Sequence, residues 1–235
     1  MNLTDEQNQS GTGVPPVTRG TEKTGETPVP LFQPLDSNGL ILQHRRALPH
    51  WEQSGCTYFV TFRLADSLPA AKLKYLRDRK GLRLEQQPKP WTERTFKKLE
   101  LYYSRRIERW LDGGLGSCWL RRKEFRDVVA TALQCFHGER YWLDCFVVMP
   151  NHVHVLLALS TKSSLAKTVH SWKSYSAHKI RRLLDRSGPL WMSEYFDHVV
   201  RSEMQLDHFR RYIRDNPAKA RLRPDEYSYR ALYLE

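Results

Sequence analysis

The sequence predicts an α+β protein in which helices cover an antiparallel sheet, and three observations lead to this fold class. Four short segments are rich in β-branched and aromatic residues, and three longer segments repeat apolar residues at helical spacing. The two kinds of segment are mixed along the chain, and only Met149–Asn151 separates two of the strands, as in a hairpin. Such an arrangement is typical of an antiparallel sheet with packed helices.

The first 45 residues predict a disordered leader. They are rich in Gly, Thr, Pro and Glu and contain almost no aromatic residues, so they bury too little surface to offset the entropy of ordering. We expect one domain over residues 46–222, with order starting near Trp51, and an irregular C-terminal tail over residues 223–235.

The first strand of that domain is expected over Cys56–Arg63, where β-branched and aromatic residues are dense. The following stretch, residues 66–122, has a less regular pattern that is broken by prolines and by Gly113–Gly114. We interpret it as an insertion on the core domain, with a basic helix over Glu93–Leu111.

The remaining elements follow from apolar periodicity and from turn residues. Their order is strand, helix, strand, strand, helix, strand, which predicts a ferredoxin-like βαββαβ sheet with helices on one face, followed by a C-terminal helix. The expected elements are a helix over Lys123–His137, strands over Tyr141–Val148 and His152–Leu159, a helix over Ser164–Leu184, a strand over Glu194–Arg201 and a helix over Glu203–Asp215.

The composition favours a polyanionic partner. Lys and Arg total 38 against 26 Asp and Glu, the net charge is +12, and 11% of the residues are aromatic. Nucleic acid is the partner that such a balance favours, although a basic surface without a specific partner remains an alternative. No apolar run reaches the roughly 20 residues that cross a bilayer, and the N-terminus lacks signal-peptide features, so we expect a cytoplasmic protein without membrane contact.

Two histidines indicate a metal site. His152 and His154 are two residues apart in a predicted strand, so their side chains share one face, with Cα atoms roughly 6.5 to 7 Å apart. Val153 and Val155 point to the other face, into the core. Two imidazoles so placed can share a divalent ion, and the alternative is a pair of histidines on a solvated face.

A tyrosine and an asparagine on the last helix provide further candidates. Tyr212 and Asn216 are four residues apart, so both lie on one helical face. Pro217 disfavours further helix, which predicts that the Asn216 amide lies at the helix terminus. A phenolate is an effective nucleophile near a metal ion, and a hard ion such as Mg²⁺ or Mn²⁺ suits a phosphate substrate. The alternative is a packing tyrosine and a C-cap.

Together, the stretch Phe146–Leu156, with Pro-Asn-His-Val-His inside it, and the later Tyr-Ile-Arg-Asp-Asn-Pro resemble the single-tyrosine HUH transposases of the insertion sequence 200-like family, in their REP-associated branch. The resemblance covers about Tyr58 to Leu222. It implies an enzyme that nicks and rejoins single-stranded, hairpin-forming repeat DNA through a covalent 5′-phosphotyrosine, aided by Mg²⁺ or Mn²⁺. By resemblance, Tyr212 is the nucleophile, and His152, His154 and Asn216 are the metal ligands.

Three alternatives remain open at this stage. Tyr175 is the rival nucleophile, although it has no candidate ligand four residues away. A histidine-triad nucleotide hydrolase would need a third histidine where Leu156 stands. A domesticated protein that binds DNA hairpins without cutting them is the non-catalytic alternative, and the protein would act as a monomer or a homodimer. The expected phosphate contacts are Lys173, Lys179, Arg201, Arg210, Arg211 and Arg214.

Overall fold

The computed structural model describes residues 32, 34, 42–45, 49–53, 55–86 and 106–232. Most of the expected leader therefore lies outside the described residues, as does most of the helix that was expected over Glu93–Leu111. Residues 106–112, which include the end of that expected helix, are helical.

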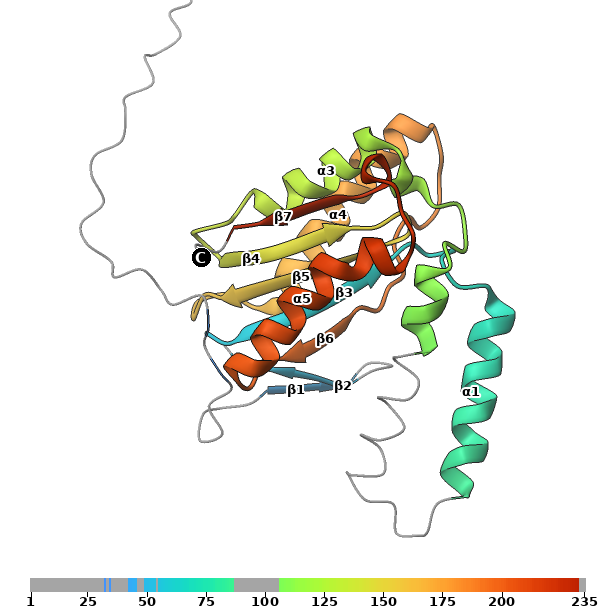
Figure 1. Cartoon of the computed structure of the whole chain (residues 1–235), viewed down its shortest axis with the longest axis horizontal. Helices are drawn as coiled ribbons and strands as arrows, with labels where there is room; N and C mark the ends of the chain where they lie inside the picture. The colour runs from blue at the N-terminus through green and yellow to red at the C-terminus, as the bar shows by residue number, and fades with distance from the viewer. Residues whose placement is uncertain are drawn as a thin grey trace, which may run out of the picture.

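Five strands form one sheet in the order β6-β3-β5-β4-β7, and every neighbouring pair in it is antiparallel. The short connection between β4 and β5 makes these two strands a hairpin, and β5 lies at the centre of the sheet (Figure 1). The strands are β3 (Thr57–Arg63), β4 (Tyr141–Val148), β5 (His152–Leu159), β6 (Phe196–Val199) and β7 (Ser228–Ala231).

Helices cover both faces of this sheet. Helices α3 (Lys123–Gln134) and α4 (Leu165–Leu184) lie on one face, and α5 (Glu203–Lys219) crosses the other (Figure 1). The α+β fold class is confirmed. The expected placement of helices on one face of the sheet holds for α3 and α4. The C-terminal helix α5 covers the opposite face.

Alternation along the strands produces these two layers. Tyr58 and Val60 of β3 belong to the core under α3 and α4, whereas Phe59 between them belongs to the core under α5. All eight residues of β5 are buried, because this central strand is covered on both sides. The face of the sheet that α5 covers is the face on which the predicted site must lie.

Serine caps set the start of two helices. The side chain of Ser164 accepts a hydrogen bond from the backbone N–H of Lys167 at the start of α4, and Ser202 accepts one from Gln205 at the start of α5. Helix α5 continues to Lys219 with Pro217 inside it, so the prediction that the helix ends before Pro217 was wrong. The fixed φ of proline is compatible with a helix, so Pro217 is accommodated within α5 although it has no N–H to donate to the carbonyl of Ile213.

Several elements of the structure were not predicted from the sequence. A β1–β2 hairpin spans Leu42–Arg45 and Pro49–Glu52, so strand structure begins inside the expected leader. Helix α1 covers Ala70–Glu85 within the expected insertion. The C-terminal tail is not irregular throughout, because β7 pairs with the edge of β4. Among the described residues, no helix is long and apolar enough to span a bilayer.

Candidate active site

The two histidines lie at the start of β5, on the face that α5 covers. Their rings are 4.7 Å apart between centroids, and His152 and His154 are 1% and 0% exposed. Val153 and Val155 point into the opposite core layer, as the alternation predicts. The sheet therefore fixes both imidazoles side by side in a space from which bulk water is excluded.

One nitrogen of each ring is held by a neighbouring polar group. Nδ1 of His154 lies 2.7 Å from the hydroxyl of Thr61, which is its partner across the β3–β5 ladder. Nδ1 of His152 lies 2.7 Å from Oδ1 of Asn151, an oxygen that can only accept, so this nitrogen carries the proton. The Nε2 atom of His152 is then a lone-pair donor, and it is buried without a hydrogen-bond partner.

Helix α5 brings Tyr212 and Asn216 to the same place. The Tyr212 ring packs edge-on against His154, with 5.2 Å between centroids, and the Asn216 amide nitrogen lies 3.4 Å from Nε2 of His154. The hydroxyl of Tyr212 and Oδ1 of Asn216 are buried, and neither has a hydrogen-bond partner among the described residues. Three side chains therefore direct unpaired polar atoms into one buried region, which is rare in a protein interior.

Two contacts fix the position of α5 on the sheet. Phe209 stacks on Phe59 of β3 with 4.4 Å between centroids. Two residues before Tyr212, the guanidinium of Arg210 makes two-pronged contacts of 2.6 to 3.1 Å with the carboxylate of Asp144 on β4, which is fully buried. These contacts fix the rotation of α5 that turns Tyr212 towards the histidines.

Burial decides the protonation states of the site. It lowers the pKa of His152 to about 3, and it lowers the pKa of His154 well below the usual value, with a further contribution from His152. Both rings are therefore neutral at physiological pH, the state in which imidazole binds a metal. Burial also raises the pKa of Tyr212 above its usual value, and the charges of Glu108 and Asp112 raise it further.

The residues present fit a divalent cation. Among the described residues, no three His, Cys, Asp or Glu side chains form a cluster that could hold a metal. However, Nε2 of His152 and Oδ1 of Asn216 have no hydrogen-bond partner, and Nε2 of His154 lies 3.4 Å from the Asn216 amide nitrogen, so a bound cation would give Nε2 of His152 and Oδ1 of Asn216 the partners they lack. A cation would also favour the phenolate of Tyr212, whose burial otherwise keeps it protonated.

The rival nucleophile lies elsewhere. Tyr175 is on α4, in the layer on the other face of the sheet, and its side chain is 45% exposed. The candidate phosphate contacts are also divided between the two layers. Lys173 and Lys179 are on α4, and Lys173 donates to the carbonyl of Ser193. The others are on or just before α5: Arg201 and Arg211, which are exposed, Arg214, which pairs with Asp215, and Arg210, which is engaged with Asp144.

The groups that hold the histidines were not predicted from the sequence. Thr61 was inside a predicted strand, and only its register opposite His154 gives it a function. Asn151 was part of the quoted motif, and its position next to His152 was the available signal. Asp112, whose pKa burial raises to about 6, is near Tyr212 in space but 100 residues away in sequence.

One family model matches the part of the chain that contains this site. Residues 121–216, which include the histidine pair, Tyr212 and Asn216, match the family model described as "Transposase IS200 like". This match supports the predicted resemblance to IS200-like transposases over these residues. No protein of curated function matches the chain.

Two solved structures are similar to the chain. One is a REP-associated tyrosine transposase bound to a REP hairpin, with 15% identity and a TM-score of 0.40, and the match covers 75% of this chain and 72% of that one. The other is a protein assigned as a transposase from Deinococcus radiodurans R1, with 16% identity and a TM-score of 0.28, and the match covers 77% of this chain and 97% of that one.

Proposed function

We propose that the protein cleaves and rejoins single-stranded, hairpin-forming repeat DNA, with Tyr212 as nucleophile and a divalent metal as cofactor. The observation that carries this proposal is the convergence of unpaired atoms from His152, Tyr212 and Asn216 in one buried region. The REP-associated branch of the family is part of the proposal.

In this mechanism, the phenolic oxygen of Tyr212 attacks the scissile phosphorus. A phosphorus–oxygen bond forms to the tyrosine as the bond to the 3′-oxygen breaks, and the 3′-oxygen leaves with a proton as a hydroxyl. The reverse attack by a DNA 3′-hydroxyl on the phosphotyrosine restores the phosphodiester and releases Tyr212. No external energy source is needed, because one phosphodiester is exchanged for another.

The chain's own residues position these groups. Thr61 and Asn151 orient the two imidazoles, and the pairing of Arg210 with Asp144 sets the rotation of α5. His152, His154 and Asn216 would hold Mg²⁺ or Mn²⁺, which polarises the phosphate and stabilises negative charge in the transition state. Two exposed cations, Arg201 just before α5 and Arg211 within it, are proposed to contact the DNA backbone.

Covalent capture tests the proposal. Purified protein, Mn²⁺ and a labelled single-stranded hairpin oligonucleotide are expected to give an adduct that survives denaturing electrophoresis. Tyr212→Phe should abolish the adduct and leave hairpin affinity within about threefold of wild type, and Tyr175→Phe is the matched control that should retain it. An adduct that persists in Tyr212→Phe and disappears in Tyr175→Phe would overturn the assignment.

A non-catalytic hairpin-binding protein is the second candidate. It shares the basic surface and the fold, so DNA binding alone does not separate the two. The buried unpaired atoms of the site favour the enzyme, because a protein that only binds DNA gains nothing from leaving them unpaired. Hairpin binding without any adduct in Mg²⁺ or Mn²⁺ would favour the non-catalytic candidate.

A further inference from the structure

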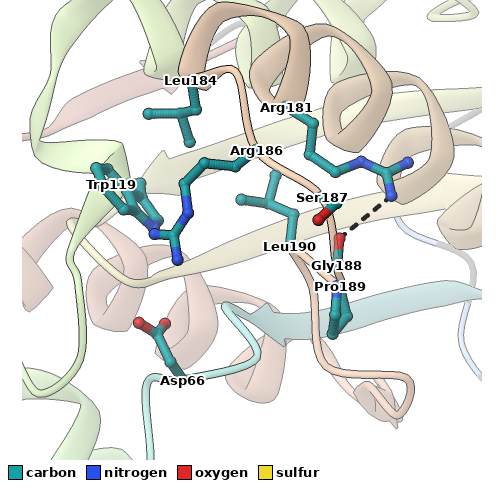
Figure 2. Close-up of a pocket in the computed structure, with 9 residues that line it drawn as sticks. All are labelled: Asp66, Trp119, Arg181, Leu184, Arg186, Ser187, Gly188, Pro189 and Leu190. Carbon is teal, nitrogen blue, oxygen red and sulfur yellow. Dashed lines mark hydrogen bonds between the residues drawn. The ribbon is translucent and has the colours of Figure 1, made fainter.

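A small hollow lies outside the metal site, between the end of α4 and the loops that follow β3 and precede α3. Its volume is about 140 Å³. Figure 2 shows the side chain of Arg186 extending between Trp119 and Leu190, with the carboxylate of Asp66 below it. The lining of the hollow includes Asp66, Trp119, Arg181, Arg186 and Leu190.

The lining combines a flat aromatic surface with charges of both signs. The guanidinium of Arg186 lies over the Trp119 ring, 5.5 Å from its centroid. The Asp66 carboxylate accepts a hydrogen bond from the backbone N–H of Ser117 at 2.8 Å, which fixes its position. Arg181 is held at the rim by its bond to the Gly188 carbonyl, at 3.2 Å (Figure 2). A planar group with polar edges matches this lining.

Both walls of the hollow are tied to the turn that carries the histidines. The backbone N–H of Leu64, two residues before Asp66, donates to the Asn151 carbonyl at 2.9 Å. The N–H of Leu120, next to Trp119, donates to the Pro150 carbonyl at 3.0 Å. The hollow therefore lies at the same end of the sheet as His152, and backbone hydrogen bonds connect its walls to the residues that directly precede His152.

We propose that this hollow binds one unpaired base of the DNA strand that enters the active site, an inference that rests on the proposed function. Sites for drug-sized ligands are roughly 300 to 1,000 Å³, so a space of about 140 Å³ accommodates a base and leaves its sugar and phosphate outside. The base stacks on the guanidinium of Arg186, which the Trp119 ring supports from its other side, as guanidinium and aromatic planes do in single-strand recognition. Asp66 accepts from an N–H on the base edge, and Arg181 meets the adjacent phosphate at the rim.

Abasic scanning combined with variants tests the inference. Hairpin oligonucleotides that each lack one base in the unpaired segment next to the stem are titrated against the wild-type protein. One position is expected to lose roughly tenfold in affinity, the magnitude of one base–aromatic stack. Trp119→Ala should bind the intact oligonucleotide about tenfold more weakly than wild type does, and removal of the base at that position should then cause no further loss of affinity. Trp119→Phe should retain part of the loss of affinity that removal of this base causes, the abasic penalty.

Matched controls separate this pocket from general electrostatics and from misfolding. Arg186→Ala should reduce the abasic penalty, whereas Arg182→Ala removes an equal charge from the exposed last turn of α4, outside the hollow, and should leave the penalty unchanged. Thermal unfolding of each variant checks the fold, and Trp119→Phe keeps the test valid if Trp119→Ala is unstable.

The outcomes distinguish the two proposals. Hairpin binding by the wild type with the same abasic profile in Trp119→Ala or Trp119→Phe would contradict the pocket and leave the proposed function intact. An equal effect of Arg182→Ala and Arg186→Ala would also contradict the pocket. Failure of the wild type to bind any hairpin would contradict the proposed function, and with it the pocket.

Discussion

Asn151 and His152 are adjacent in sequence and bonded through their side chains, with 2.7 Å between Oδ1 of Asn151 and Nδ1 of His152. The amide nitrogen of Asn151 faces the other way and donates to the carbonyls of Leu111 and Leu115 at 3.2 and 2.9 Å. Asn151 is 1% exposed, so each of these bonds replaces one to water. A single amide thus orients a metal-binding histidine and anchors the segment that contains Asp112.

The first prediction concerns this amide. Asn151→Ala removes the group that fixes the tautomer of His152, and loss of such a partner typically costs 10- to 100-fold in metal affinity. We expect that weakening in Mn²⁺ titrations followed by electron paramagnetic resonance. Asn151→Asp keeps an acceptor for His152 and loses the donors to Leu111 and Leu115, so its affinity should fall less. Equal Mn²⁺ affinity in wild type and Asn151→Ala would refute the positioning role.

The sequence was sufficient for features that depend on local pattern. The bounds of β4 and β5 agree with the prediction, because Pro150 and Asn151 separate two continuous apolar runs. The shared helical face of Tyr212 and Asn216 also followed from their spacing, and the structure places both beside His154. Periodicity of 2 and of 3.6 residues carries this information without any knowledge of the rest of the chain.

Features that depend on long-range contacts were not predictable. The apolar stripe of α5 is the same whichever face of the sheet it covers, so its layer was not specified. The four residues of β7 do not form an apolar run in the sequence, and they become a strand only by pairing with β4. Arg210 has the sequence pattern of a phosphate contact, and only the fold brings the buried Asp144 to it. Tertiary context overrides local pattern in each case.

The second prediction concerns that ion pair. Arg210→Ala leaves the carboxylate of Asp144, which is fully buried, without its partner, so we expect a loss of about 3 to 5 kcal/mol in the free energy of unfolding. The double variant Asp144→Leu with Arg210→Met removes both charges and should recover most of that loss. Urea unfolding measures both. A loss below about 1 kcal/mol in Arg210→Ala would mean that the pair does not anchor α5.

The third prediction concerns acid stability without metal. The folded pKa of His152 is about 3, whereas the unfolded value is 6.5, so protons bind preferentially to the unfolded chain as the pH falls below 6.5. The stabilisation is complete above pH 6.5 and decreases towards pH 3. Between pH 6.5 and 5 the loss from His152 is roughly 2 kcal/mol, from about 1.4 kcal/mol per pH unit. Urea unfolding with a chelator measures it.

His152→Asn is the control for this titration, since the amide does not ionise. Its free energy of unfolding should decline less steeply between pH 6.5 and 5 than that of wild type, with the remaining slope due in part to His154, whose pKa is also lowered by burial. Parallel pH profiles for wild type and His152→Asn would show that His152 is not buried as a neutral ring.

The fourth prediction separates stability from metal binding at Asn216. This side chain is fully buried, its Oδ1 has no hydrogen-bond partner among the described residues, and its amide nitrogen lies 3.4 Å from Nε2 of His154, so the metal-free protein gains little from the amide. Asn216→Leu replaces it with an apolar group of similar size, and we expect the metal-free melting temperature to stay equal or rise. The rise in melting temperature on adding Mn²⁺ should shrink or vanish, because a ligand is lost.

Asn216→Asp is the matched variant, and its carboxylate should enlarge the Mn²⁺-induced rise. An unchanged Mn²⁺ response in Asn216→Leu would remove Asn216 from the metal site and leave the two histidines without the third ligand proposed for them.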